Sequence, residues 1–314
     1  MKNLLATVLI GQARLEQIRK KNKLNRLLCF GSEFLINSLC GPFFKAGMIH
    51  ASESWQQLGF EDTVVNISFD SDLQKDYDAL PSVLKVLQTH RIRASFATIG
   101  KWIEIYPDIH KQLLDEGHEI VNHTYTHPNN RHFNPGKKMI QLSDQEKKEE
   151  IYRCHEVCEK LLNYTLKGYR APHLDSCHDR RIYPILRELG YTYSSSDMAF
   201  RFDSLGAPCS IEGIWEFPLS PASPLSSGVW HLYTCLSTSV VARERLFSEK
   251  EYLKNYTHII TAAKPGYFNF YFDPMDVVRM PTFSECLTYL SEMGVEAISY
   301  GDLVESLKKN MRIS

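Results

Sequence analysis

The chain has 314 residues, of which 43% are hydrophobic and 23% are charged, and this is the composition of an ordinary globular protein. Its length supports one large domain with a full core, or two small ones. The formal net charge is −1, so the charge balance gives no reason to expect a nucleic-acid partner.

The first 60 residues differ in charge from the rest of the chain. Residues 1–60 carry eight Lys and Arg against three Asp and Glu, a net charge of +5, which leaves −6 for residues 61–314. The apolar run Leu4–Ile10 resembles a minimal signal-peptide core, but only Lys2 precedes it, so we expect it to remain uncleaved. The apolar stretch 27–49 is too interrupted for a membrane span. We predict a basic and apolar helical extension over 1–60, which either packs on the domain or makes peripheral contact with a membrane.

Cysteine usage points to a reducing compartment. The eight cysteines contain no CxxC pair and no regular framework. Cys154 and Cys158 fall on the apolar face of a predicted helix, where we expect buried thiols rather than metal ligands. A cytoplasmic location, with or without membrane association, fits this usage better than secretion.

From residue 61 onward a pattern repeats: an amphipathic helix, a glycine, then a short apolar strand. Gly117, Gly190 and Gly294 stand where helix C-caps are expected, because a C-cap needs a left-handed residue. The alternation predicts a parallel α/β barrel or a wound sheet of seven or eight strands. With no low-complexity linker, 61–314 reads as one domain. The strand candidates are 64–69, 94–100, 118–123, 167–170, 191–196, 214–219, 267–272 and 295–300.

Polar residues stand at the ends of several of these strands. In a β/α barrel the catalytic groups lie on loops at the carboxyl ends of the strands, which meet at one rim. We therefore expect these residues to converge, although any one of them alone is explained by a local capping role. They are Asp70 and Asp72, His123 and His127, Arg170, Asp197, and Asp273.

An aspartate and two histidines form the ligand set of a catalytic metal, which keeps open positions for water and substrate. His123 and His127 are four residues apart, as two ligands on one helix would be, but Pro128 disfavours helical geometry at His127. We therefore place both on a strand-to-helix loop. The expected cofactor is a divalent metal, with zinc first and Co²⁺, Ni²⁺ or Fe²⁺ as alternatives.

Two motifs, Phe69–Asp72 and His123–Pro128, resemble the first two motifs of the polysaccharide deacetylases, the NodB homology domain of carbohydrate esterase family 4. The resemblance extends over residues 61–310 and implies a distorted (β/α) barrel. It also implies that Asp70 is the general base and that Asp72, His123 and His127 bind the metal.

The third and fourth family motifs also have counterparts. Tyr169–Pro172 resembles the third motif, which implies that Arg170 orients the catalytic aspartate. Ser195–Asp197 resembles the fourth, which implies that Asp197 supports that arginine.

The fifth motif departs from the family pattern. The family usually has Leu-His at the end of a late strand, with the histidine as general acid, whereas this chain has Asp273 after Phe272. An aspartate can donate the proton only with a raised pKa. Otherwise Asp70 returns the proton that it took, or His173 or His231 acts in its place.

The resemblance implies a metal-dependent hydrolase that removes an N-acetyl group from a sugar in a polysaccharide or in a lipid-linked glycan precursor. Two alternatives stay open: a C–N hydrolase of a small non-sugar amide, and a catalytically silent homologue that keeps the metal and binds glycan. Aromatic residues that would stack on sugars near the rim, or pack in the core, are Trp102, Tyr106, Trp215 and Trp230.

Overall fold

The computed structural model describes residues 49–174, 179–197, 199, 204, 206–220, 249–262 and 264–311. Its strands form one sheet in the order β6-β7-β5-β4-β3-β2-β1-β8, with β9 paired to β1. Every pair is parallel apart from β6 and β7. The strands are β1 (Val64–Ser71), β2 (Ser95–Thr98), β3 (Glu119–Asn122), β4 (Gly168–Tyr169), β5 (Tyr193–Ser194), β6 (Cys209–Ile211), β7 (Ile214–Glu216), β8 (Tyr267–Phe272) and β9 (Glu296–Ala297).

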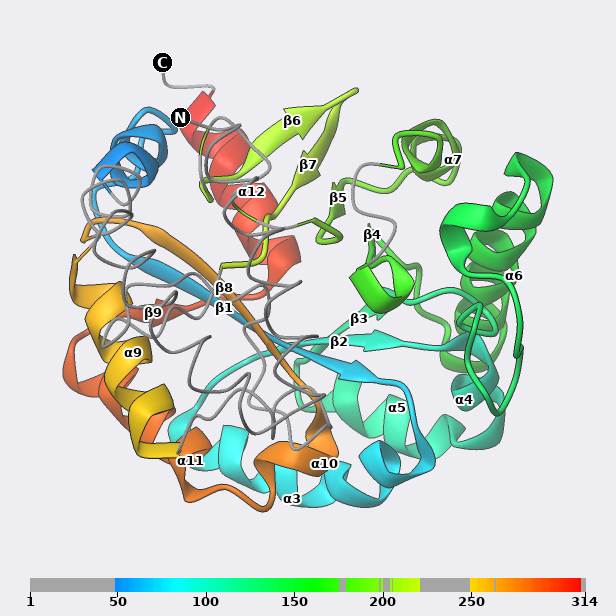
Figure 1. Ribbon diagram of the computed structural model, residues 1–314, viewed down its shortest axis with the longest axis horizontal. Coiled ribbons are helices and arrows are strands. Elements are labelled where there is room, and N and C mark those ends of the chain that lie inside the picture. Colours follow the sequence, from blue (N-terminus) through cyan, green and yellow to red (C-terminus); the bar gives the residue numbers. More distant parts are fainter. Residues whose placement is uncertain are drawn as a thin grey trace, which may run out of the picture.

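Helices connect these strands and surround the sheet (Figure 1). In Figure 1, α3 and α9 to α11 lie toward one end of the sheet, α4 to α6 lie toward the other, and α12 approaches from a third side. The helices are α3 (Gln74–His90), α4 (Gly100–Ile105), α5 (Pro107–Asp115), α6 (Asp144–Leu162), α7 (Ile182–Glu188), α9 (Glu249–Ala262), α10 (Pro274–Val277), α11 (Pro281–Glu292) and α12 (Tyr300–Met311), with short 3₁₀ turns η1 (Met139–Gln141) and η2 (Pro172–Leu174).

The repeated helix–glycine–strand pattern predicted the parallel strands correctly. All eight predicted strands are present, and β6, an antiparallel neighbour of β7, is an additional one. Gly117, Gly190 and Gly294 have φ of 80°, 70° and 62°, the left-handed values that a C-cap requires. At the start of α6, the side chains of Ser143 and Glu146 bond each other's main-chain N–H groups, which forms a capping box.

The segment that follows β7 brings the two ends of the sheet together. The N–H of Phe217 donates to Ser194 and that of Leu219 to Asp197, on the β5 side. The N–H of Ser220 donates to Asn269 of β8 on the other side. These bonds curve the sheet into a distorted barrel, with its parallel strands directed toward one rim.

Residues alternate between the inside of the barrel and the helical layer, as the pleat of a strand requires. On β1, Val65, Ile67 and Phe69 pack with the helices in one large core. The intervening Val64 packs with α12 in a separate core, and Asp70 contacts Arg170 across the interior. The alternation therefore directs the polar residues at the strand ends into the barrel.

The structure describes only the end of the predicted N-terminal extension, because residues 1–48 lie outside the described part. Residues 49–56 are helical, and the fully buried Trp55 packs with α12 and stacks on Phe60 at 4.0 Å between ring centroids. This part of the extension is therefore packed on the barrel. Among the described helices, none is both long and apolar enough to cross a membrane.

Candidate metal centre and active site

The two histidines of the second motif lie on a loop that follows β3, as predicted. His123 comes directly after the strand, and both Thr124 and His127 have positive φ, of 66° and 55°. Local hydrogen bonds hold this geometry: the N–H of Thr124 donates to Oδ1 of Asn122, and the N–H of His127 donates to Oγ1 of Thr124. The positive φ values exclude a helix here, and the loop turns both imidazoles toward the end of β1.

Asp72, His123 and His127 meet at the carboxyl end of the barrel. Their ligand atoms all lie within 4.8 Å of one another. Nε2 of His123 is 3.2 Å from Oδ1 of Asp72, and Nε2 of His127 is 3.4 Å from Oδ2. Nδ1 of His123 lies 2.9 Å from the carbonyl oxygen of Arg170, which leaves Nε2 free to face the group.

The donor atoms of this group fit a divalent cation. Oδ1 of Asp72, Nε2 of His123 and Nε2 of His127 are buried and have no hydrogen-bond partner in the part of the chain that the structure describes. A buried polar atom without a partner costs free energy. One oxygen and two imidazole nitrogens that converge on a common point are the ligands that zinc and similar metals bind.

The electrostatics of Asp72 and His127 agree with a cation site. Burial raises the pKa of Asp72, but His127 and His123 outweigh burial and bring it well below its usual range. Burial lowers the pKa of His127 to about 3. Near neutral pH, Asp72 is therefore an anion and His127 a neutral imidazole, the protonation states that bind metals.

Asp70 and Arg170 form a buried ion pair beside this group. Nη1 of Arg170 donates to Oδ1 of Asp70 at 2.8 Å, and the side chains are 0% and 9% exposed. Asp70 and Asp72 are two positions apart on an extended segment, so both project to the same side. The arginine therefore fixes the orientation of a carboxylate that adjoins the metal ligands.

The segment after β5 contacts Arg170 through Ser195. Nε of Arg170 donates to the carbonyl oxygen of Ser195 at 2.9 Å. The buried Glu216 in turn fixes this segment, since it accepts the main-chain N–H groups of Ser196 and Asp197. Asp197 is 3% exposed, and the support of Arg170 by its carboxylate stays a prediction.

Asp273 follows β8 and neighbours Asp70. The register pairs Phe69 with Phe272, so the next residues along, Asp70 and Asp273, are neighbours at the rim. Burial, reinforced by Asp76, Asp72 and Asp70, raises the pKa of Asp273 well above its ordinary value. The placement that the sequence predicted is therefore present, with the electrostatic environment that a protonated aspartate needs.

Asp76 links the loop after β1 to the loop after β8. Its carboxylate accepts the N–H groups of Asp72 and Leu73 on one side and of Met275 on the other. Burial raises its pKa to about 7. The sequence offered no sign of this role beyond an acidic residue in the first turn of α3.

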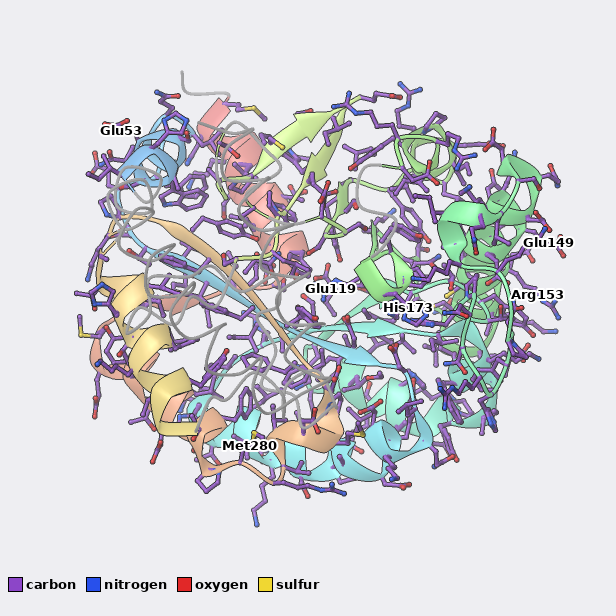
Figure 2. All side chains as sticks on the ribbon, viewed as in Figure 1. Glu53, Glu119, Glu149, Arg153, His173 and Met280 are labelled. Atoms are coloured by element: carbon purple, nitrogen blue, oxygen red, sulfur yellow. The ribbon has the colours of Figure 1, made fainter. Side chains whose placement is uncertain are left out.

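Other candidates from the sequence have mixed outcomes. The ring of His173, labelled in Figure 2, lies edge-on to that of His127 at 4.4 Å between centroids. Trp102 is only 2% exposed, and its Nε1 donates to the carbonyl oxygen of Asp72, so it packs in the core as a support for the site. His231 and Trp230 lie outside the described residues.

Sequence reasoning missed most of the groups that hold Arg170. Besides Ser195, its Nη2 donates to Oγ of Ser68 and to Oη of Tyr300. Ser68 had a usable signal, because it stands two residues before Asp70 on the same side of β1. Tyr300 had none, since it belongs to a distant helix.

The comparison with protein families matches the segment that contains Asp72, His123 and His127. Residues 58–194 match the family model described as polysaccharide deacetylase. The chain is 31% identical over 109 residues to a peptidoglycan-N-acetylglucosamine deacetylase from Bacillus cereus, a match that covers 35% of this chain and 36% of that protein. The chain therefore matches about a third of the length of that relative.

Solved structures share the fold. A protein from Mycobacterium smegmatis that is assigned by name to the polysaccharide deacetylases has a TM-score of 0.62 at 15% identity, covering 80% of this chain and 92% of that one. A carbohydrate esterase family 4 pseudoenzyme from Bacillus anthracis has a TM-score of 0.51 at 16% identity, covering 77% and 66%. These likenesses concern the fold alone. The match over residues 58–194 assigns that segment to the polysaccharide deacetylase family, and the solved structures show that the chain shares the fold.

Proposed function

We propose that this protein is a metal-dependent N-deacetylase that hydrolyses the N-acetyl group of a sugar. The observation that carries the proposal is the convergence of buried, unpartnered ligand atoms of Asp72, His123 and His127 beside the Asp70–Arg170 pair. A cation holder alone does not require a neighbouring carboxylate that is oriented by a buried arginine. Hydrolysis requires such a base.

Asp72, His123 and His127 would hold the metal, for which we propose zinc. When bound, a divalent cation lowers the pKa of water and polarises a carbonyl oxygen. Asp70 takes the proton of the attacking water as that water adds to the acetyl carbon. Arg170 keeps the carboxylate of Asp70 in position through its 2.8 Å hydrogen bond.

Asp273 supplies the proton to the departing nitrogen. As the bond between the acetyl carbon and nitrogen breaks, the nitrogen must gain a proton, and the products are acetate and a sugar amine. Burial and the surrounding carboxylates raise the pKa of Asp273, which supports a protonated aspartate as donor. His173 beside His127 is the alternative donor.

The substrate that we propose is an N-acetylated saccharide in a polysaccharide or a lipid-linked precursor. The name of the Bacillus cereus relative specifies peptidoglycan N-acetylglucosamine, which supports an amino sugar over a small non-sugar amide. We also propose a cytoplasmic location, with membrane contact through residues 1–60. The free thiols of Cys154, Cys158 and Cys286 are compatible with such a reducing compartment.

Acetate release tests the proposal. Zinc-loaded protein should release acetate from at least one member of a panel of N-acetylated mono- and oligosaccharides. Asp70→Asn should keep the metal and lower turnover by a factor on the order of 10², whereas His123→Ala should lose the metal. Release only from non-sugar amides would favour the small-amide hydrolase. Metal and glycan binding without any release would identify a silent homologue.

A further inference from the structure

We propose that Tyr300, the first residue of α12, is a positioning residue that holds Arg170 in the orientation it needs to align Asp70. Tyr300 is 0% exposed and lies beyond the 58–194 segment that matches the family model. The inference rests on the proposed function, and it assigns to the C-terminal helix a part in setting the active site.

The start of α12 is fixed inside the barrel. The main-chain N–H groups of Tyr300 and Gly301 donate to the buried carboxylate of Glu119, at 3.1 Å each. Figure 2 shows Glu119 beside the inner end of this helix. A Cβ at position 301 would lie 2.8 Å from Oε1 of Glu119, so a larger residue there would displace the end of this side chain. The helix N-terminus is thereby secured, and the ring of Tyr300 projects into the barrel.

The hydroxyl of Tyr300 has a direction that its neighbours determine. Nδ2 of Asn269 donates to the carbonyl oxygen of Phe217 at 2.8 Å, so Oδ1 of Asn269 must face the other way, toward Tyr300. Tyr300 donates its single hydroxyl proton to that Oδ1 at 2.6 Å. The lone pairs of Oη then face Arg170, whose Nη2 donates to them at 2.5 Å.

The three nitrogens of the Arg170 guanidinium have different acceptors. Nε donates to the carbonyl oxygen of Ser195, and Nη1 donates to Oδ1 of Asp70. Nη2 has two N–H groups, and the nearest of its acceptors is Oη of Tyr300, ahead of Oγ of Ser68 at 2.9 Å and Oγ of Ser195 at 3.1 Å. Arg170 is fully buried, so water does not replace a lost acceptor. Without the hydroxyl, the planar guanidinium turns toward the remaining acceptors, and its alignment on Asp70 changes.

The variant Tyr300→Phe removes only this hydroxyl, and Tyr267→Phe is the matched control. Tyr267 is also a buried tyrosine of the same core, and its hydroxyl donates to Oδ1 of Asn66 at 2.5 Å rather than accepting from Arg170. A general effect of losing a buried tyrosine hydroxyl should therefore be similar in both variants.

The first measurement does not depend on activity. In ¹⁵N-labelled full-length protein, the Nε–H resonance of Arg170 is identified by its loss in Arg170→Lys. Tyr300→Phe should shift or broaden this resonance, and Tyr267→Phe should leave it in place. An Arg170 resonance that is unchanged in Tyr300→Phe overturns the inference, whatever the enzyme does. A shifted resonance in a wild-type protein that releases no acetate supports the contact and refutes the proposed function instead.

The second measurement separates positioning from a general structural role. Tyr300→Phe should lower kcat by about tenfold while KM changes less than about twofold and zinc affinity is unchanged, because Tyr300 contacts neither the metal ligands nor the rim. In the Asp70→Asn background, the same substitution should have no further effect on the residual kcat, since the carboxylate that it aligns is absent. An equal loss in both backgrounds, or an equal loss in Tyr267→Phe, overturns the positioning role.

Discussion

The substitution Arg170→Met should destabilise the protein strongly, because it leaves the buried carboxylate of Asp70 without its positively charged partner. Arg170 is 0% exposed and the Asp70 side chain is 9% exposed, with 2.8 Å between their nearest nitrogen and oxygen atoms. Breaking such a pair by removing one partner costs about 3–5 kcal/mol of unfolding free energy. Methionine fills much of the volume of the arginine stem, so most of this loss is electrostatic.

The double variant Asp70→Asn/Arg170→Met isolates that electrostatic part. It removes both charges together, so its loss of unfolding free energy should be smaller than the sum of the two single losses by about 2–3 kcal/mol.

The pH dependence of the loss in Arg170→Met has a defined sign. Burial already raises the pKa of Asp70, and removal of Arg170 raises it further. A group with a raised folded pKa stabilises the protein at low pH and loses that contribution as pH rises through the folded pKa. The penalty of Arg170→Met should therefore be larger at pH 8 than at pH 5.

Urea denaturation followed by circular dichroism, with a chelator present, measures these free energies. Lys148→Met is the matched control, because Lys148 and Glu188 are similarly close, 2.7 Å apart, but 36% and 53% exposed. It should change the unfolding free energy far less. Additive single losses at Asp70 and Arg170, or an equal loss at Lys148, would refute the reasoning.

Three further outcomes are expected. Zinc at 100 times its dissociation constant should raise the unfolding free energy by about 2.7 kcal/mol, and His127→Ala should remove this gain in a thermal melt with and without chelator. Asp273→Asn should reduce turnover at neutral pH by about tenfold or more, and near-normal acetate release would transfer the acid role to another group. Burial lowers the pKa of His110 to about 4, so the unfolded state binds a proton first as the pH falls. Between pH 7.5 and 4.5 the wild type should thus lose about 2.5 kcal/mol more unfolding free energy than His110→Asn, as measured by urea denaturation at both pH values.

The sequence by itself determined the strands and the residues that face the barrel interior. Strand and C-cap signals are local, and so is the two-residue alternation that puts Ser68, Asp70 and Asp72 on one side of β1. The motif His123–Pro128 also carried its own information, because Pro128 argues against a helix at His127. These features could be predicted because each depends on residues a few positions apart.

Only the tertiary structure decided which side chains meet across the barrel. The partners of Arg170 come from β1, the segment after β5 and the start of α12, and their meeting depends on strand order and curvature, which no local pattern contains. The sequence thus suggested Asp197 as the support of Arg170, whereas the contacts described include Ser195, Ser68 and Tyr300. The burial of Trp102 against Asp72 was equally beyond reach, because an aromatic residue near a rim packs inward or outward according to the neighbours that the fold supplies.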